Sequence, residues 1–564
     1  MDRFWLKSYP PGMPADIDPG EISSLKELIE SSLKQFADRT AFIHMGKQIS
    51  YRELDQLSAQ FAGWLQGRAG LKKGDRVAIM LPNLLQYPVV MFGVLRAGLV
   101  VVNTNPLYTP TELQHQLQDS GASAVIVLEN FAITVEKSLA GTQLRQVIVT
   151  QVGDLLDFPK SAVVNFVVRR VQKRIPAWNI PGALRFKDVM KQARQHTLQS
   201  VSVDHSDLAF LQYTGGTTGV AKGAMLTHRN MVANLLQCRA WFQQVALDHV
   251  TYVCALPLYH IFSLTANCLL FTSLGGSGLL ITNPRDFPAF IADLRRHRPM
   301  FFMGVNTLFN ALMNTPGFDR IDFKGLVATV GGGMAVQKAV ADRWLQLTGC
   351  TITQGWGLTE ASPVGCCTLL RGDKTFTGSI GLPVPSTELS IRGDGGEDLG
   401  VDASGEICLR GPQVMRGYWN RPDETAQVIT ADGWLRTGDI GRVDANGFVF
   451  IEDRKKDMII VSGFKVFPNE VEDVVTHMPG IAECAAVAQQ DPHSGECVAL
   501  FVVRKDPALT AEAVIAYCHT YLTSYKVPRH VYFRQELPKT NVGKILRRAL
   551  RDELAAGKGA VAKS

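Results

Sequence analysis

The chain has 564 residues, of which 46% are apolar and 20% are charged. This length exceeds what one hydrophobic core supports, so two or more domains are expected, and the composition excludes a disordered or fibrous protein. A net charge of +6, from 58 basic and 52 acidic residues, argues against a dedicated nucleic-acid binder.

Cysteine usage and apolar segments bear on the cellular compartment. The ten cysteines, from Cys238 to Cys518, show no C-x-x-C spacing, which predicts reduced thiols and a cytoplasmic location. The N-terminal residues lack the apolar region and cleavage site of a secretory signal. The most apolar segment, residues 77–103, is interrupted by Pro82 and Arg96, short of the roughly 20 unbroken apolar residues of a membrane span. We interpret it as a buried strand, a helix and a second buried strand.

The strand-helix-strand rhythm recurs along the first part of the chain. Short runs rich in Val, Ile and Leu alternate with amphipathic stretches, which predicts parallel sheets covered by helices. Further strands are expected at residues 123–128, 146–150, 208–214, 251–257, 276–282 and 326–333. The fold class predicted for this large region is therefore α/β.

The pattern changes from about residue 385. Short alternating strands separated by turn residues predict a small, mostly antiparallel, barrel-like unit over residues 385–455. Residues 456–564 combine predicted helices and strands with a basic end, which is typical of a separate α+β domain. The expected organisation is a large N-terminal region of several subdomains, residues 1–455, followed by a small domain.

A glycine-rich stretch, YTGGTTGVAKGA, runs from Tyr213 to Ala224 with four glycines, three threonines and one lysine. Glycines let backbone N–H groups approach a ligand, while hydroxyls and a lysine complement phosphate oxygens. We interpret the local pattern as strand, loop and helix, which favours a nucleoside triphosphate. Because Gly223 follows Lys222, the spacing differs from an ordinary P-loop. A flexible surface turn is the alternative for the stretch taken alone.

Four further stretches end predicted strands: PLYHIF (257–262), GGGMAV (331–336), QGWGLTE (354–360) and RTGD (436–439). Ligands gather at the carboxyl ends of strands in α/β sheets. Together, and in this order, the stretches resemble the motifs of the adenylate-forming superfamily over essentially the whole chain. YTGGTTGVAKGAMLTHRNM, ALPLYHIFSLTANCLLF, GVNTLFNAL and the long stretch 432–472 are similar to bacterial long-chain-fatty-acid–CoA ligases.

The resemblance implies an enzyme that activates a long- or medium-chain fatty acid. The carboxylate and ATP give acyl-AMP and pyrophosphate, and the thiolate of coenzyme A then displaces AMP. Such chemistry needs positioning and charge neutralisation rather than a protein nucleophile. The resemblance also implies Mg²⁺ as cofactor, a homodimer and a role in fatty-acid degradation. The alternatives are a ligase of the same fold for aryl or medium-chain acids, transfer of acyl-AMP to a carrier protein, and a non-catalytic acyl or nucleotide binder.

The resemblance assigns the glycine-rich stretch to the β and γ phosphates of ATP. The residues concerned are Tyr213, Thr214, Gly215, Gly216, Thr217, Thr218, Gly219 and Lys222. Glu360 and Thr214 are the expected Mg²⁺ ligands, because this ion prefers carboxylate and phosphate oxygens. Outside this family context, an exposed loop glutamate such as Glu360 is usually only solvated.

Two of the stretches are expected to surround the rest of the nucleotide. By resemblance, the wall beside the adenine is expected to contain Gly331, Gly332, Gly333, Trp356, Gly357 and Thr359. Trp356 stands where the family usually has tyrosine. The indole can stack on a purine, but it lacks the phenolic oxygen, so we expect no hydrogen-bonding role for it.

Charged residues of the later motifs complete the expected site. By resemblance, Asp439 accepts hydrogen bonds from the ribose hydroxyls, and Arg454 adds a cation near the ribose or phosphate. Lys544, in PKTNVGKILRR, matches the family's catalytic lysine and is expected to reach the α-phosphate and the carboxylate. The neighbouring Arg547 and Arg548 are interpreted as solvated.

The family rotates its small domain between the two half-reactions. Lys456, in DRKKD, aligns with the hinge, where a turn between domains can absorb a large backbone change. After rotation, three residues of SGFKVFP are expected to face the nucleotide and line the path of the pantetheine arm: Gly463, Phe464 and Lys465.

Apolar stretches suggest where the acyl chain goes. By resemblance, residues 260–271 and 304–314 are expected to line a tunnel for an alkyl chain, although most such stretches are ordinary core. Residues 160–187 carry seven basic residues and no acidic one. Val164, Val168, Val171 and Ile175 recur near helical spacing, which predicts a helix that docks on anionic lipid, followed by Trp178. A solvated helix packed on the domain is the equal alternative.

Overall fold

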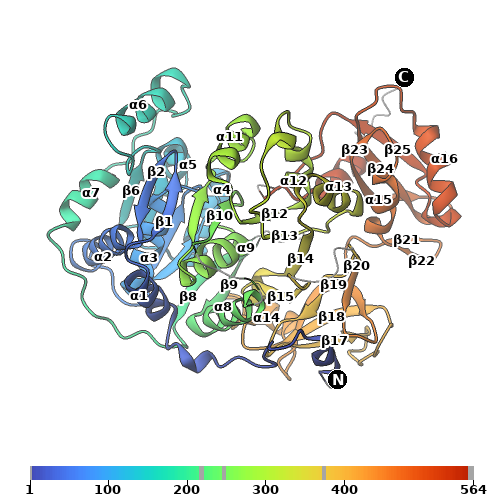
Figure 1. The fold of residues 1–564 in the computed structure, drawn as a ribbon, viewed down its shortest axis with the longest axis horizontal. Coiled ribbons are helices and arrows are strands. Elements are labelled where there is room, and N and C mark those ends of the chain that lie inside the picture. Colours follow the sequence, from blue (N-terminus) through green and yellow to red (C-terminus); the bar gives the residue numbers. More distant parts are fainter. Residues whose placement is uncertain are drawn as a thin grey trace.

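The computed structural model describes residues 3–214, 221–243, 245, 249–370, 376–540 and 542–556. Four β-sheets organise these residues, with helices packed on the sheets of the larger part (Figure 1). Among them, no helix is long and apolar enough to cross a membrane. None of the ten cysteines is in a disulfide in this part of the chain.

A seven-stranded sheet has the order β7-β6-β5-β3-β4-β8-β9, and its strands are parallel except at β9. The strands are β3 (Arg76–Met80), β4 (Val100–Asn103), β5 (Ala124–Leu128), β6 (Gln146–Thr150), β7 (Leu184–Arg185), β8 (Leu208–Thr214) and β9 (Lys222–Thr227). The apolar runs of β4 and β5 are buried along their whole length, as expected for strands covered on both faces.

A nine-stranded sheet has the order β16-β15-β14-β13-β12-β10-β11-β1-β2, with a parallel centre and antiparallel ends. Its strands are β1 (Thr40–His44), β2 (Lys47–Ser50), β10 (Thr251–Cys254), β11 (Ser277–Leu280), β12 (Phe301–Gly304), β13 (Ala328–Gly332), β14 (Ile352–Gly357), β15 (Val364–Cys367) and β16 (Leu382–Pro383). The predicted α/β class of the N-terminal region is confirmed.

Helices cover both sheets, and local sequence sets where they begin. Thr109 and Glu112 form a capping box at the start of α4, where Pro110 occupies the first turn. The α-helices are α1 (Leu25–Gln35), α2 (Tyr51–Gly67), α3 (Gln86–Arg96), α4 (Pro110–Ser120), α5 (Ala132–Lys137), α6 (Lys160–Phe166), α7 (Phe186–Ala193), α8 (His228–Phe242), α9 (Ile261–Ser263), α10 (Leu270–Ser273), α11 (Phe287–His297), α12 (Asn306–Met313) and α13 (Lys338–Thr348). One hydrophobic cluster joins side chains from both sheets, among them Phe210 and Phe301.

The glycine-rich stretch does not run from strand to helix as predicted. Residues 222–227 form β9, which pairs antiparallel with β8. Helix α8 begins only afterwards, where Thr227 accepts a hydrogen bond from the Asn230 N–H in a capping box. The prediction of a loop leading directly into a helix is therefore wrong, because pairing with β8 extends these residues.

The small antiparallel unit has four strands in the order β17-β18-β19-β20. They are β17 (Glu388–Arg392), β18 (Gly405–Arg410), β19 (Leu435–Val443) and β20 (Val449–Arg454), and α14 (Pro422–Val428) lies beside them. Buried side chains of these strands, such as Leu389 and Ile407, belong to the main hydrophobic cluster. The antiparallel character predicted for this unit is confirmed.

The C-terminal residues form an α+β unit at one end of the molecule (Figure 1). Its sheet has the order β22-β21-β24-β23, and β25 pairs with β24. The elements are β21 (Ile459–Val461), β22 (Phe464–Val466), α15 (Pro468–Thr476), β23 (Ile481–Asp491), β24 (Gly495–Arg504), α16 (Ala511–Tyr521), β25 (His530–Arg534) and α17 (Arg547–Ala555). Two hydrophobic clusters of this unit contain no residue before Ile459. The boundary at residue 456 stays a prediction.

Candidate active site

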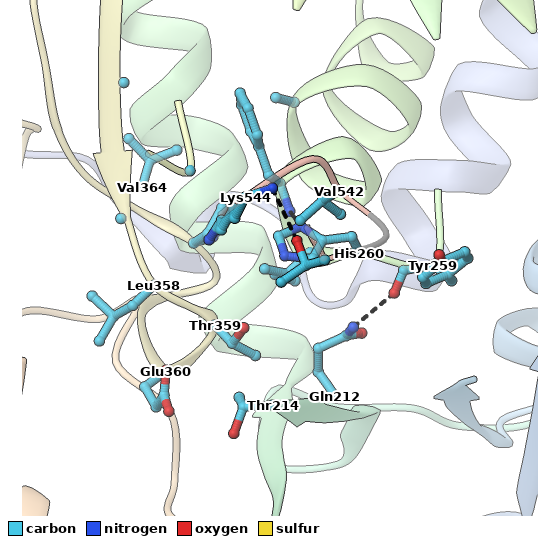
Figure 2. Close-up of a pocket in the computed structure, with 18 of the residues that line it drawn as sticks. Gln212, Thr214, Tyr259, His260, Leu358, Thr359, Glu360, Val364, Val542 and Lys544 are labelled. Atoms are coloured by element: carbon cyan, nitrogen blue, oxygen red, sulfur yellow. Dashed lines mark hydrogen bonds between the residues drawn. The ribbon is translucent and has the colours of Figure 1, made fainter. Parts of the chain in front are cut away.

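A cavity of about 690 Å³ lies where the two large sheets, the small antiparallel unit and the C-terminal unit meet. Its wall takes residues from the carboxyl ends of β8 and β14, from β20 and from the loop that carries Lys544. Figure 2 shows Lys544 and Val542 on one side of the cavity and Thr214 and Glu360 on the other. Three of the four stretches predicted to gather at strand ends thus meet in one space, whereas no described residue of RTGD (436–439) lines it.

The β8–β9 hairpin brings a hydroxyl and a cation together. Thr214 and Lys222 are register partners, and both line the cavity. The Lys222 ammonium forms an ion pair with Glu424 of α14 and lies 4.9 Å from the centre of the Tyr418 ring. The other predicted residues of the loop lie outside the described residues: Gly215, Gly216, Thr217, Thr218 and Gly219.

Tyr213 anchors the end of β8 to α4. Its hydroxyl donates to Asp119 Oδ2 at 2.6 Å, and burial together with this carboxylate raises the pKa of the phenol. The ring packs on Gly223, where an added Cβ would lie 3.1 Å from it. The hydroxyl therefore serves the fold, while the ring forms part of the cavity wall.

Glu360 lies in the short helix η7 (Thr359–Ala361), directly after β14. Tyr418 donates from its hydroxyl to Glu360 Oε1 at 2.7 Å, a contact that no sequence pattern predicted. Gly357, Thr359 and Glu360 all line the cavity. No group of three or more His, Cys, Asp or Glu side chains able to hold a metal ion occurs among the described residues. A metal ion here would need oxygens from a ligand.

The three glycines after β12 fall into two groups. Gly331 and Gly332 belong to β13, where an added Cβ would lie 2.7 Å from a neighbouring atom, so close packing explains both glycines. Gly333 has φ +75° and lines the cavity, and a Cβ there would lie 3.2 Å from Lys544 Cε. The structure therefore places Gly333 in the wall and the other two behind it, and their predicted place beside the adenine stays a prediction.

Trp356 contacts the carboxylate predicted to bind the ribose. Its Nε1 donates to Asp439 Oδ2 at 2.8 Å, and Arg454 Nε lies 2.8 Å from Asp439 Oδ1. Asp439 and Arg454 are also register partners on β19 and β20. The expectation that Trp356 has no hydrogen-bonding role is wrong, because the indole N–H acts as the donor in place of a phenol.

Lys544 reaches the cavity on a loop that is tied to the N-terminal region. Its backbone N–H donates to Thr540 Oγ1 at 3.0 Å, and the Thr307 hydroxyl of α12 donates to Gly543 O at 2.9 Å. Burial, followed by the positive charge of Arg454, lowers the pKa of Lys544 to about 8. The lysine is therefore held close to other cations in the absence of a bound anion.

His260, from the PLYHIF stretch, lies beside this lysine (Figure 2). Burial, and then the charge of Lys544, lowers the pKa of His260 to about 3. Its Nδ1 accepts a hydrogen bond from the Phe262 N–H at 3.3 Å. The cavity thus contains a neutral imidazole at physiological pH.

The predicted hinge and the residues after it occupy different places. Lys456 lines the cavity, and burial lowers its pKa. The β21–β22 hairpin, with Gly463, Phe464 and Lys465, is outside the cavity wall. The Phe464 side chain is 56% exposed and stacks on Tyr525 with 4.8 Å between the ring centres. This arrangement presents Lys544, not the hairpin, to the cavity.

Two family descriptions match the chain. The AMP-binding enzyme family model matches residues 29–419, and the model of the AMP-binding enzyme C-terminal domain matches residues 470–544. The chain belongs to the AMP-binding enzyme family.

Comparison with similar proteins supports the resemblance that the motifs indicated. A long-chain-fatty-acid–CoA ligase of Salmonella typhimurium is 53% identical over 560 residues, which cover 99% of both chains. One of Yersinia pestis is 53% identical over 98% of both chains. The crystal structure of an anthranilate CoA ligase with anthranoyl-AMP shares the fold, with a TM-score of 0.85 and 24% identity, and covers 96% of this chain and 100% of that chain. The predicted resemblance to the adenylate-forming superfamily and to bacterial long-chain-fatty-acid–CoA ligases is confirmed.

In this AMP-binding enzyme, the cavity wall also contains apolar side chains. Residues of the predicted stretch 260–271 line it: Ile261, Phe262, Ala266 and Leu270. No described residue of 304–314 does so. Helix α8 instead contributes three side chains that the sequence did not point to: Cys238, Trp241 and Phe242. Their spacing of one helical turn is equally typical of ordinary core packing, so it carried no separate signal.

Arg547 is part-buried and lies in an ionic network, so the interpretation of this residue as solvated is wrong. Its side chain is 16% exposed, and its Nη2 donates to Glu472 at 2.8 Å and to Asn469 at 2.7 Å. Nη1 lies 3.5 Å from Asp453, which is at the end of β20 and fully buried. Arg548, in contrast, is 52% exposed and forms an ion pair with Asp552 on its own helix. The network joins the segment after Lys544 to the predicted hinge.

The basic segment 160–187 differs from its predicted form. Helix α6 passes into a π-helical turn at Val167–Val171, and Val164 packs on the main core. Trp178 packs on another hydrophobic cluster and is covered by Arg185 at 5.0 Å. The predicted apolar stripe and tryptophan therefore do not form one exposed face. The large apolar side chains that are exposed here are Phe158, Val163, Phe166 and Val171.

Proposed function

We propose that this chain is an ATP-dependent ligase that joins a long- or medium-chain fatty acid to coenzyme A through acyl-AMP, releasing pyrophosphate and AMP. The observation that carries the proposal is one cavity whose wall contains both the charged side chains Lys222, Glu360 and Lys544 and apolar side chains of α8. The names of the 53% identical relatives support the same substrate class.

In the first half-reaction, a carboxylate oxygen attacks the α-phosphorus of ATP and pyrophosphate leaves. Negative charge then spreads over the phosphate oxygens, where fixed cations stabilise the transition state. Lys544 neutralises charge at the α-phosphate and the carboxylate, while Lys222 and Thr214 hold the β and γ phosphates. The ribose hydroxyls donate to Asp439, with Arg454 beside them.

Glu360 and Thr214 fit a Mg²⁺ ion shared with the phosphates. Tyr418 engages Glu360 Oε1, and within the described residues no hydrogen bond engages Oε2. Mg²⁺ keeps few protein ligands and takes its other oxygens from phosphate and water. Bound there, the ion would neutralise charge on the phosphate oxygens.

The second half-reaction needs the thiolate of coenzyme A to reach the acyl carbon, form the thioester bond and displace AMP. Lys544 occupies the cavity wall in the present arrangement, so we propose that the C-terminal unit rotates about Lys456. The hinge lies between the small sheet and Ile459, where the C-terminal sheet begins. Gly463, Phe464 and Lys465 would then line the path of the pantetheine arm.

Separate assays of the two half-reactions test this proposal. Lys544→Ala should reduce fatty-acid-dependent exchange of labelled pyrophosphate into ATP by about 100-fold or more, because it removes a transition-state cation. Thioester formation from supplied acyl-AMP should stay within about threefold of the wild-type rate. Equal loss in both assays would contradict the division of labour, and a wild-type protein without any exchange would contradict the function itself.

A panel of acids separates the alternatives. Fatty acids of several lengths, benzoate-like acids and coenzyme A are offered in turn, with pyrophosphate release as the readout. Release with aryl acids alone, or acyl transfer to a carrier protein but not to coenzyme A, would favour the other ligases. Nucleotide binding without any release would favour the non-catalytic binder.

We also propose that the segment around α6 contacts an anionic lipid surface, from which the fatty acid enters. Its exposed apolar side chains lie close in sequence to three exposed cations, Arg170, Lys173 and Arg174. This combination is typical of peripheral lipid contact. In Figure 1, α6 lies at the end of the molecule away from the C-terminal unit, so contact there would leave the proposed rotation unhindered.

Vesicle sedimentation tests this surface. The wild-type protein should bind phosphatidylcholine vesicles containing about 30% phosphatidylglycerol several-fold better than neutral vesicles, and added salt should weaken binding. Phe158→Ser with Phe166→Ser should remove most of the binding. Val401→Ser, at another exposed apolar side chain, is the matched control. Equal partitioning of the wild type into both vesicle types would overturn the proposal.

Three further expectations accompany the proposed function. The cytoplasmic location, the homodimer and the role in fatty-acid degradation all stay predictions from the sequence and its resemblance. Gel filtration with light scattering would settle the assembly.

A further inference from the structure

We propose that Trp356 is a positioning residue for the nucleotide, because its indole N–H holds the Asp439 carboxylate in the orientation that receives the ribose hydroxyls. The inference rests on the proposed function only in taking ATP as the ligand of this cavity. In this proposal the edge of the Trp356 ring has a role of its own, which is separate from stacking by the face of the ring.

The indole is fixed on both sides. A Cβ added at Gly365 would lie 2.9 Å from Trp356 Cζ3, so the six-membered ring lies against a glycine that leaves room for it. At the other edge, Nε1 donates to Asp439 Oδ2 at 2.8 Å. Trp356 and Asp439 are 7% and 3% exposed, so water competes little for this hydrogen bond.

The carboxylate has one satisfied and one unsatisfied oxygen. Oδ2 accepts from the indole, whereas Oδ1 is buried without a hydrogen bond of good geometry among the described residues. Arg454 Nε lies 2.8 Å from Oδ1, so this contact is an ionic one. A buried acceptor without a donor is costly, and a ribose hydroxyl would supply the missing donor. The indole thus fixes Oδ2, while Oδ1 lies against Arg454, which lines the cavity although Asp439 itself does not.

Tryptophan suits this task differently from tyrosine. An indole N–H is a donor only, whereas a phenol both donates and accepts. The ring therefore always offers a hydrogen to the carboxylate, and its rigid plane relates the orientation of Asp439 to the wall beside the purine. The side chain of Trp356 therefore fixes the position of the ribose site relative to that of the base site.

A cycle of protein and nucleotide changes tests the inference. Titration calorimetry would measure Kd for ATP and for 2′,3′-dideoxy-ATP, without fatty acid, in the wild type, Trp356→Phe and Trp356→Tyr. Trp344→Phe is the matched control, because Trp344 is also buried and donates to Thr329 at 3.1 Å. Thermal unfolding would establish that each variant is folded.

We expect Trp356→Phe to weaken ATP binding about fivefold and dideoxy-ATP binding less than about twofold, because only ATP uses the carboxylate. Trp356→Tyr, which restores a donor, should recover part of the loss. Equal weakening of both nucleotides, or an equal effect of Trp344→Phe, would overturn the inference. A wild-type protein that binds ATP but exchanges no pyrophosphate would refute the proposed function and leave the inference standing.

Discussion

At the scale of single residues, the two lysines of the cavity are held differently. Lys222 is already neutralised by Glu424, whereas burial, followed by the positive charge of Arg454, lowers the pKa of Lys544 to about 8. An anionic phosphate would restore the preference of Lys544 for the charged form. Nucleotide binding should therefore raise the pKa of Lys544 and keep its ammonium charged to a higher pH.

This low pKa predicts a pH dependence of the first half-reaction. Lys544 carries its charge below about pH 8 and loses it as the pH rises through that value, so kcat/KM for pyrophosphate exchange should fall above about pH 8. Lys544→Arg should lower the rate but remove this falling limb, because a guanidinium stays charged. Exchange at limiting ATP, from about pH 6.5 to 9.5, checks it. An unchanged limb in the arginine variant would assign the titration to another group.

At the scale of elements, an ionic network connects α17 with β20 and α15. Arg547 contacts Glu472 and Asp453, and burial raises the pKa of Asp453 to about 6. Asp453 is also tied to α15 by accepting from the Asn469 N–H at 2.8 Å. The loop carrying Lys544 is therefore fixed from its C-terminal side by the same residues that border the predicted hinge.

Removal of Arg547 should destabilise the protein. Arg547→Met leaves buried carboxylates without their cation and should lower the free energy of unfolding by about 3–5 kcal/mol. Arg548→Met is the matched control, since its exposed ion pair is worth at most about 1 kcal/mol. Urea unfolding followed by circular dichroism measures both. Similar losses in the two variants would mean that the network contributes nothing special.

Elements also show how far the sequence was informative. Strands such as β3, β5 and β6 were predictable, because short runs rich in Val and Ile are typical of strands that are buried on both faces of a parallel sheet. Strand β9 was not, because residues 222–227 become a strand only by pairing with β8 across the loop.

The residues of the candidate site also fall into a predictable group and an unpredictable one. Motif residues such as Glu360 and Lys544 were predictable from local sequence, whereas Tyr418 and the contact between Trp356 and Asp439 depend on residues far apart in the chain. Such contacts leave no periodic pattern in the sequence from which they could be predicted.

At the scale of the whole molecule, the C-terminal unit meets the rest of the cavity through polar contacts. Thr307 donates to Gly543 O at 2.9 Å, and Asn310 donates to Ala482 O at 3.2 Å. Water can replace such hydrogen bonds at little net cost. The unit can therefore turn without exposing its own hydrophobic clusters.

A reversible cross-link tests whether turning is required. A Cβ added at Gly543 would lie 2.8 Å from Thr307 Oγ1, so Thr307→Cys with Gly543→Cys places two thiols within disulfide reach. Oxidation should leave pyrophosphate exchange largely intact and reduce acyl-CoA formation by about tenfold or more, with recovery on reduction. Each single-cysteine variant is a control. Full acyl-CoA formation in the oxidised protein would show that no rotation is needed.

The separate hydrophobic clusters also bear on how the protein is made. Because the clusters of the C-terminal unit contain no residue before Ile459, the larger part can complete its own core while the ribosome is still translating the C-terminal unit. Lys544, the proposed catalytic cation, belongs by contrast to the unit that is translated after the larger part. A growing chain could thus fold its larger part first and become active only after the C-terminal unit has formed.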